Sequence, residues 1–208
     1  MRIKNLILDL GGVLYDLDYS ATESEFEKIG FSTSFSRTEQ SDLIDLFEEG
    51  KLSPIEFAEG VSAMSARKEP LSLEEVTFAW NKMLLGIKPR QWELLTQLKS
   101  KYNLYLYSNT NAIHIEAVWQ HIKTQHGKDG LNDYFLKIYL SNVMGIRKPK
   151  TEGFDVIVEE NKLVREETMF VDDSPQHVEG AMKSGIKALW LDLEVSNLKT
   201  LLQKNDLL

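Results

Sequence analysis

The sequence LILDLGGV at residues 6–13 decides the fold, because a short apolar run is followed at once by an acidic residue and a pair of glycines. The apolar run is typical of a buried strand, and Asp9 stands at its carboxyl end. The glycines that follow allow a small substrate to approach the backbone. Since α/β enzymes keep their reactive groups at such strand ends, Asp9 is the first candidate for a functional side chain.

Two further apolar runs end in polar residues. One is followed by Ser108 and Asn109, and the other by Asp172 and Asp173. If these strands are parallel neighbours of the first, their polar ends meet at one edge of the sheet, next to Asp9. The resulting crevice would contain three carboxylates, a hydroxyl and an amide, which suits a divalent metal and a phosphate.

Taken together, four short motifs resemble those of the haloacid dehalogenase (HAD) superfamily, in the same order along the chain. They are Asp9-Leu10-Gly11-Gly12-Val13-Leu14, Ser108-Asn109-Thr110-Asn111, Lys148-Pro149 and Asp172-Asp173. The match spans residues 6–181, and it is most similar to the branch that includes the bacterial α-D-glucose-1-phosphate phosphatase. That branch also has a glycine two residues after the nucleophile. Four motifs in order make a specific signal, although each alone is weak.

Strand and helix patterns alternate beyond about residue 100, which predicts a parallel sheet with helical crossovers. The expected strands are 104–107, 138–140, 169–171 and 188–191, and the expected helices are 112–123, 152–160 and 175–184. The predicted fold class is therefore α/β. The resemblance implies a Rossmann-like HAD core with a small helical cap inserted after the first strand.

Residues 19–88 have a different pattern, because strand-like runs are absent and helix starts are frequent. Ser53 and Ser72 each precede a glutamate by three positions, which predicts two capping boxes. We expect residues 1–18 and 89–208 to form the α/β core, and residues 19–88 to form the cap. By resemblance, this cap closes over the active site.

Asp9 is the predicted nucleophile, since a carboxylate can attack phosphorus and form an aspartyl-phosphate. Asp9, Asp172 and Asp173 offer the hard oxygen ligands that Mg²⁺ prefers. The resemblance adds the backbone carbonyl of Gly11 as a further metal ligand. The simpler structural explanation is that these acidic residues only occupy turns at strand ends, but the apolar strands immediately before them favour the metal.

The predicted phosphate-binding residues are Ser108, Asn109 and Lys148. By resemblance, the Ser108 hydroxyl and the adjacent backbone N–H groups bind phosphate oxygens. Lys148 would neutralise the charge of the phosphate and of the intermediate, and is therefore also a predicted catalytic residue. The alternatives are a helix N-cap for the Ser108 segment and a charged surface loop for Lys148.

Gly11 departs from the usual pattern of the superfamily, in which this position carries a second Asp that acts as general acid and base. Such a group is typically worth ~10²–10⁴ in rate. Either the substrate has a leaving group that needs little help, or another residue supplies the proton. Asp16, Asp18 and His114 are possible substitutes, although each also fits a purely structural role.

Composition limits the classes of function. The chain has 208 residues, a formal net charge of −8 and no cysteines. The charge argues against a nucleic-acid partner, and the lack of cysteine excludes a disulfide framework and a thiolate zinc site. Because no long apolar segment is present near the start, we expect a cytoplasmic protein without a membrane partner. The oligomeric state stays open.

The predicted function is Mg²⁺-dependent hydrolysis of a small phosphorylated metabolite, with a sugar phosphate favoured by the resemblance. One alternative is a 2-haloacid dehalogenase, which needs no metal. Clustered carboxylates without a cation would repel one another, which argues against it. The other alternative is a phosphometabolite-binding protein that has lost turnover, and Gly11 is the observation in its favour.

Overall fold

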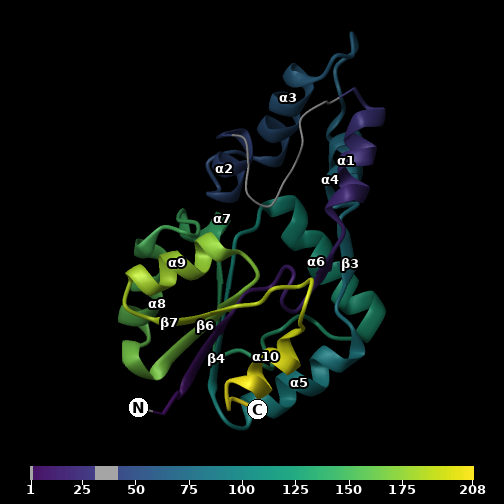
Figure 1. The fold of residues 1–208 in the computed structure, drawn as a ribbon. Helices are drawn as coiled ribbons and strands as arrows, with labels where there is room; N and C mark the ends of the chain where they lie inside the picture. Colours follow the sequence, from purple (N-terminus) through teal and green to yellow (C-terminus); the bar gives the residue numbers. More distant parts are fainter. Residues whose placement is uncertain (1, 31–41) are drawn as a thin grey trace.

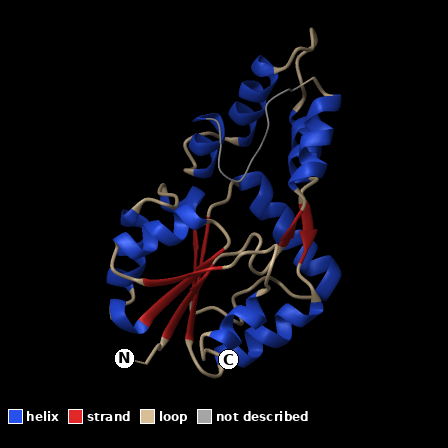
Figure 2. Cartoon of the chain, in the orientation of Figure 1, coloured by secondary structure: helices blue, strands red, loops and turns tan. Residues whose placement is uncertain are grey.

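The computed structural model describes residues 2–30 and 42–208. A five-stranded sheet in the order β5-β4-β1-β6-β7 forms the centre of this part of the chain, and all of its neighbouring strands are parallel (Figures 1 and 2). The strands are β1 (Asn5–Leu8), β4 (Asn103–Ser108), β5 (Lys137–Leu140), β6 (Thr168–Asp172) and β7 (Lys187–Trp190). The predicted α/β class and the predicted strands are confirmed.

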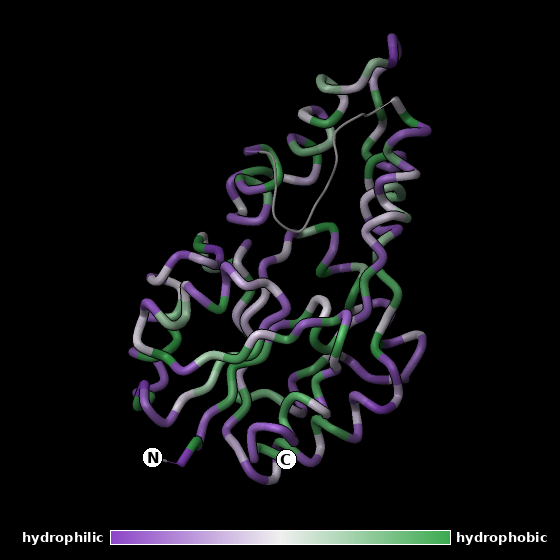
Figure 3. Tube along the Cα trace, in the orientation of Figure 1, coloured by the Kyte–Doolittle hydropathy of each residue, from purple (hydrophilic) through white to green (hydrophobic). Residues whose placement is uncertain are grey.

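Helices cover both faces of this sheet. Side chains alternate along each buried strand, so neighbouring residues pack against helices on opposite faces. Leu6 and Leu8 pack on one face with α5 (Pro89–Lys99), α6 (Ala112–His126) and α10 (Leu198–Lys204). Ile7 points to the other face and packs with α8 (Thr151–Glu160) and α9 (Pro175–Lys183). In Figure 3 the central strands are mainly hydrophobic, and the helices around them contain both hydrophobic and hydrophilic residues. Short elements α7 (Ser141–Met144) and the 3₁₀ turn η1 (Arg165–Glu167) complete the layer.

The register of the central strands brings the predicted site residues to one edge. Leu8 pairs with Leu106 of β4 on one side and with Val171 of β6 on the other. The Asp9 N–H then donates to the Val171 carbonyl at 3.0 Å, so Asp9 leaves the sheet beside Asp172. After β1 the chain visits β4 and β5 on one side and then β6 and β7 on the other. A crevice at this switch point is where α/β proteins bind ligands.

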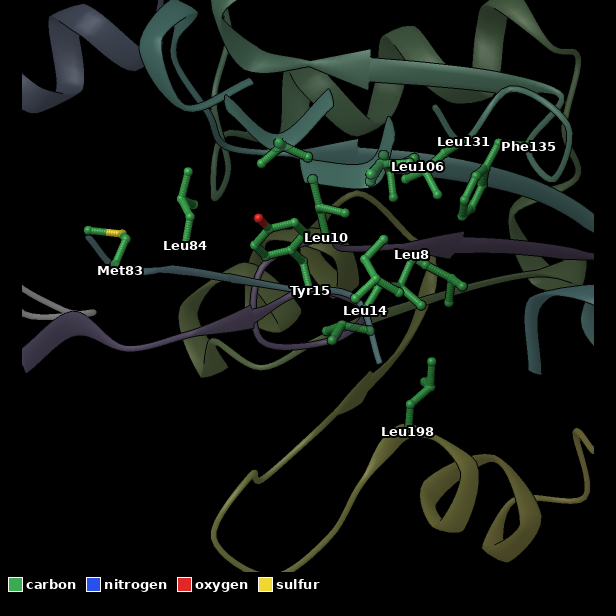
Figure 4. Close-up of a cluster of buried hydrophobic side chains, with 14 of the residues drawn as sticks. Leu8, Leu10, Leu14, Tyr15, Met83, Leu84, Leu106, Leu131, Phe135 and Leu198 are labelled. Atoms are coloured by element: carbon green, nitrogen blue, oxygen red, sulfur yellow. The ribbon is translucent and has the colours of Figure 1, made fainter. Parts of the chain in front are cut away.

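The loop after β1 is anchored by a hydrophobic cluster below the site. Leu10, Leu14 and Tyr15 are buried there in the same cluster as Leu106 and Leu131 (Figure 4). The Tyr15 hydroxyl also forms a hydrogen bond of 2.6 Å with His121 Nδ1 on α6. This packing fixes the backbone that carries Asp9 and Gly11.

Between β1 and α5 the chain forms a group of helices that lies beyond the carboxyl edge of the sheet (Figure 1). These are α1 (Tyr19–Lys28), α2 (Asp42–Glu48), α3 (Pro54–Met64) and α4 (Leu73–Asn81). Both predicted capping boxes are present, with Ser53 at the start of α3 and Ser72 at the start of α4. Part of the predicted cap, residues 31–41, lies outside the described residues, as does Met1 of the predicted core.

The expectation that residues 19–88 contain no strand is wrong. Strand β3 (Leu84–Gly86) pairs antiparallel with β2 (Asp16–Leu17), where the chain leaves the core and returns to it. A strand of three residues is too short to produce a recognisable alternation of polar and apolar positions. Within the described ranges, no helix is long and apolar enough to cross a membrane.

Candidate active site

A cavity of about 270 Å³ opens at the carboxyl edge of the sheet, under the helices inserted after β1. Both the core and α2 contribute to its walls. The charged and polar side chains that line it are Asp9, Tyr19, Asp45, Glu48, Asn109, Arg147, Lys148, Asp173, Ser174, Gln176 and His177. Gly11 and Leu17 line the same cavity.

Lys148 lies at the base of this cavity and joins two of the predicted carboxylates. Its ammonium donates to Asp9 Oδ1 at 2.7 Å and to Asp172 Oδ2 at 2.6 Å. The lysine is fully buried, and its Nζ also lies 5.4 Å from the ring centroids of Tyr107 and Phe170. The alternative of a charged surface loop is therefore wrong for Lys148. A buried ammonium with two carboxylates is a pre-formed electrostatic site.

The carboxylates of this network differ in their affinity for protons. Burial raises the pKa of Asp9 to about 8, with Asp172 and Asp173 adding to the effect and Lys148 opposing it. Burial also works to raise the pKa of Asp172, but Lys148 and His177 outweigh it and hold that pKa well below its usual range. Of these two carboxylates, Asp9 is the one whose charge the protein alone stabilises less. A cation bound beside it would reverse this, because a metal is then the largest local charge.

Three carboxylates are arranged as a metal site requires. One oxygen each from Asp9, Asp172 and Asp173 lies within 4.8 Å of the others. Asp173 approaches the loop after β1 so closely that a Cβ on Gly12 would lie 2.3 Å from Asp173 Oδ2. Gly12 has a φ of +75°, which favours glycine. The donor set is all oxygen, and it fits a hard divalent cation such as Mg²⁺.

Asp172 itself lies beneath the cavity and is fixed by its neighbours. Its Oδ1 accepts from the Ser174 N–H at 2.7 Å, and both of its oxygens lie 3.1 Å from His177 Nδ1. The helix start predicted at Ser174 and Pro175 is present as the beginning of α9. The acidic pair thus directly precedes a helix start, and the same position keeps both of its carboxylates in the cluster with Asp9.

Asn109 lines the cavity, but its side chain binds the main chain of Lys148. Its Oδ1 accepts from the Lys148 N–H at 2.8 Å, and its Nδ2 donates to the Lys148 carbonyl at 3.0 Å. Ser108 is buried and lines an adjoining, more apolar cavity that Asn109 also borders. Asn109 therefore belongs to the predicted site by binding the main chain of Lys148. Ser108 lies next to the main cavity and lines the adjoining one.

The three candidate substitutes for the missing acid are engaged elsewhere. Asp16 pairs with Lys88, and Asp18 caps α1 by accepting from the Ser20 N–H at 3.0 Å. His114 Nε2 is 2.9 Å from the Trp80 carbonyl, and its ring stacks on Trp80 at 4.7 Å between centroids. Burial lowers the pKa of His114 to about 4. A neutral His114 that donates Nε2–H to a carbonyl cannot also protonate a leaving group.

Glu48, Arg147 and His177 were not identified as site residues from the sequence, although all three line the cavity. Arg147 Nη2 binds Glu48 Oε2 at 2.9 Å, and Arg147 Nη1 binds Asp45 Oδ1 at 2.8 Å. These contacts join α2 to the loop that carries Lys148. No local pattern could have found them, because Arg147 and Glu48 are 99 positions apart.

Comparison with known proteins agrees with this geometry. The sequence pattern of the haloacid dehalogenase-like hydrolase family matches residues 3–185. The chain is 33% identical over 179 residues, 85% of each protein, to a D-ribitol-5-phosphate phosphatase of Bacteroides thetaiotaomicron.

Solved structures are similar over nearly the whole chain. A HAD family enzyme of Bacteroides thetaiotaomicron, in complex with magnesium and inorganic phosphate, has a TM-score of 0.84 and 33% identity, with 93% of this chain and 96% of that one covered. A HAD-like family hydrolase from Porphyromonas gingivalis has a TM-score of 0.86 and 26% identity, with 99% and 98% covered. The resemblance to the glucose-1-phosphate phosphatase branch stays a prediction. The superfamily prediction is confirmed, and the chain belongs to the haloacid dehalogenase-like hydrolases.

Proposed function

We propose that this hydrolase is a Mg²⁺-dependent phosphatase of a small phosphorylated polyol or sugar. The observation that carries the proposal is the buried Lys148 ammonium between Asp9 and Asp172, with Asp173 completing a three-carboxylate cluster. The named activity of the relative from Bacteroides thetaiotaomicron supports the substrate class. The cavity of about 270 Å³ suits a small metabolite.

In the proposed reaction, an oxygen of Asp9 attacks phosphorus and forms an aspartyl-phosphate, which water then hydrolyses. Lys148 stabilises the negative charge of the phosphate throughout. Asp9, Asp172, Asp173 and the carbonyl of Gly11 would hold Mg²⁺, which supplies charge neutralisation at the phosphoryl oxygens. Asn109 positions Lys148 through its main chain.

We also propose that residues 19–88 act as a cap. Support comes from α2, whose Glu48 and Asp45 reach the cavity and bind Arg147 of the core. Helix α4 contributes Trp80, whose carbonyl binds His114 of α6. The cap would shield the reacting phosphate from bulk water, as lids do in other enzymes.

Phosphate release from D-ribitol 5-phosphate, measured with Mg²⁺ and with excess EDTA, tests the proposal. We expect turnover with Mg²⁺ and none with EDTA, because the ligands offered are hard oxygens. Halide release from a 2-haloacid in EDTA would instead favour a dehalogenase. Phosphate or polyol phosphate binding without turnover, detected by calorimetry, would favour a non-catalytic binding protein.

A further inference from the structure

The position two residues after the nucleophile carries no side chain, and the structure shows what fills that space. A Cβ built on Gly11 would lie 2.8 Å from Leu17 Cδ1, so it would point at the Leu17 side chain. Leu17 lines both the main cavity and the adjoining one. An apolar methyl group thus occupies the place where a carboxyl group at position 11 would project.

Glu48 lies on the walls of the same two cavities. It is the last residue of α2 and lines both spaces together with Gly11 and Leu17. Among the other carboxylates of the main cavity, Asp9 and Asp173 belong to the metal cluster, and the Asp45 side chain is 42% exposed. The Glu48 side chain is only 10% exposed. Glu48 is therefore the buried carboxyl group that faces the cavity from the cap.

The two oxygens of Glu48 have different surroundings. Arg147 binds Oε2 twice, through Nε at 3.0 Å and Nη2 at 2.9 Å. Within residues 2–30 and 42–208, no hydrogen bond reaches Oε1. Burial raises the pKa of Glu48, with Asp45 adding to the effect and Arg147 and Lys148 opposing it. A carboxyl group in such surroundings retains its proton at higher pH than an exposed glutamate does.

We propose that Glu48 is the general acid and base of this enzyme, supplying from the cap the carboxyl group that Gly11 lacks. This inference rests on the phosphatase function proposed above. Arg147 would act as the positioning residue that fixes Oε2 and leaves Oε1 directed to the substrate.

In the proposed reaction, Glu48 gives up a proton in the first step and regains one in the second. Asp9 attacks phosphorus, the bond from phosphorus to the leaving oxygen breaks, and the electron pair stays on that oxygen, which takes the proton of the Glu48 carboxyl group. The alcohol departs. Glu48, now ionised, takes a proton from water as the water oxygen attacks the aspartyl-phosphate. The Asp9 oxygen leaves with its bonding pair, and both side chains return to their starting states.

Kinetics with two substrates test this role. One is a sugar-alcohol phosphate, whose alkoxide is a poor leaving group, and the other is 4-nitrophenyl phosphate, whose phenolate leaves without protonation. For Glu48→Gln we expect kcat/KM to fall by about 10²–10⁴ with the first substrate and by less than about fivefold with the second. Glu49→Gln is the matched control, because Glu49 pairs with Lys51 and Lys150.

A rescue experiment separates a chemical role from a structural one. Adding Gly11→Asp to Glu48→Gln restores a carboxyl group at a position that lines the same two cavities, provided that the end of the Leu17 side chain shifts. We expect the double variant to recover at least tenfold in kcat/KM with the sugar-alcohol phosphate. Equal losses of kcat/KM with both substrates, without rescue, would overturn the proposal. It would also be overturned if Tyr19→Phe, and not Glu48→Gln, lost activity selectively with the sugar-alcohol phosphate. If Glu48→Gln does not fold, Glu48→Asp serves instead, with a smaller loss that is again confined to the poor leaving group.

Failure of the proposed function gives a different result. In that case the wild-type protein would hydrolyse neither phosphate ester in Mg²⁺, whatever residue stands at position 48, and the inference would fall with it. If the wild-type protein hydrolyses both esters and Glu48→Gln hydrolyses them equally well, Glu48 is not the general acid and base. The proposed phosphatase function would then still stand.

Discussion

The ammonium of Lys148 lies 2.7 Å from Oδ1 of Asp9, with the lysine fully buried and Asp9 only 7% exposed. The same ammonium donates to Asp172 Oδ2 at 2.6 Å, and removing the lysine would leave the buried carboxylate of Asp172 without a compensating charge, which is costly. Lys148 therefore has two tasks, which are to hold the carboxylates together and to meet the phosphate. Loss of this residue should affect both stability and turnover.

We predict that Lys148→Ala lowers kcat/KM for a phosphate ester by about 10² or more, because a buried charge-assisted contact to the phosphate is lost. The free energy of unfolding should also fall, by about 3 kcal/mol in the absence of Mg²⁺. Steady-state kinetics and urea denaturation measure the two effects. Added Mg²⁺ should recover part of the stability, since a cation at the cluster replaces the lost charge.

Lys150→Ala is the control for that variant. Lys150 is 54% exposed and pairs with Glu49, so its removal should cost at most about 1 kcal/mol and leave turnover nearly unchanged. Similar kinetics for the two alanine variants would contradict the role given to Lys148.

The Asp9→Asn variant should have no detectable phosphatase activity but an intact fold. An amide of the same size cannot form the acyl phosphate, so the nucleophile is lost while the packing is kept. Because burial raises the pKa of Asp9 from 3.8 to about 8, the folded metal-free protein keeps a proton on Asp9 that the unfolded chain has released, so its stability falls as the pH rises from 3.8 towards 8. We therefore expect the melting temperature of Asp9→Asn in EDTA at pH 7 to equal or exceed that of the wild type. Calorimetry and a phosphate-release assay measure the two properties, and wild-type turnover would reject Asp9 as the nucleophile.

Stability should fall in acid partly through His114. Burial lowers its pKa from 6.5 to about 4, so between these values the unfolded chain binds a proton that the folded chain does not. Stability from this residue is thus complete above pH 6.5 and is lost as the pH falls towards 4, by roughly 3–4 kcal/mol. Chemical denaturation at several pH values should show that the free energy of unfolding falls less in acid for His114→Gln than for the wild type. Parallel curves for the two proteins would exclude this contribution.

Strand ends were the part of the site that the sequence could predict. Asp9 and Asp172 each follow an apolar run, and parallel pairing through Leu8 and Val171 brings them together. The prediction succeeds because the alternation of strand and helix fixes the topology, and the topology fixes which ends meet. The family resemblance, and not the strand topology, indicated Lys148, whose ammonium lies between Asp9 and Asp172 in the structure.

Contacts between distant segments could not be predicted in this way. The bond from Arg147 to Glu48 depends on how α2 packs over the sheet, and neither residue carries a local signal. Asn109 was expected to meet the phosphate, but its amide binds the main chain of Lys148, which only the folded geometry reveals. Short β3 was missed because pairing with β2, and not local propensity, makes it a strand.

Two adjacent glycines should respond differently to the same change. Gly12→Ala introduces a Cβ at a φ of +75° and 2.3 Å from Asp173 Oδ2, so the backbone is strained and Asp173 must move. Because Asp173 belongs to the carboxylate cluster, we predict that the Mg²⁺ concentration for half-maximal activity rises about 10- to 100-fold. Gly11 does not have a positive φ, and in Gly11→Ala only the end of the Leu17 side chain has to shift. The Mg²⁺ concentration for half-maximal activity should therefore change less than about threefold in this variant. Titration of activity with Mg²⁺ compares the two, and equal sensitivity would show that Asp173 takes no part in metal binding.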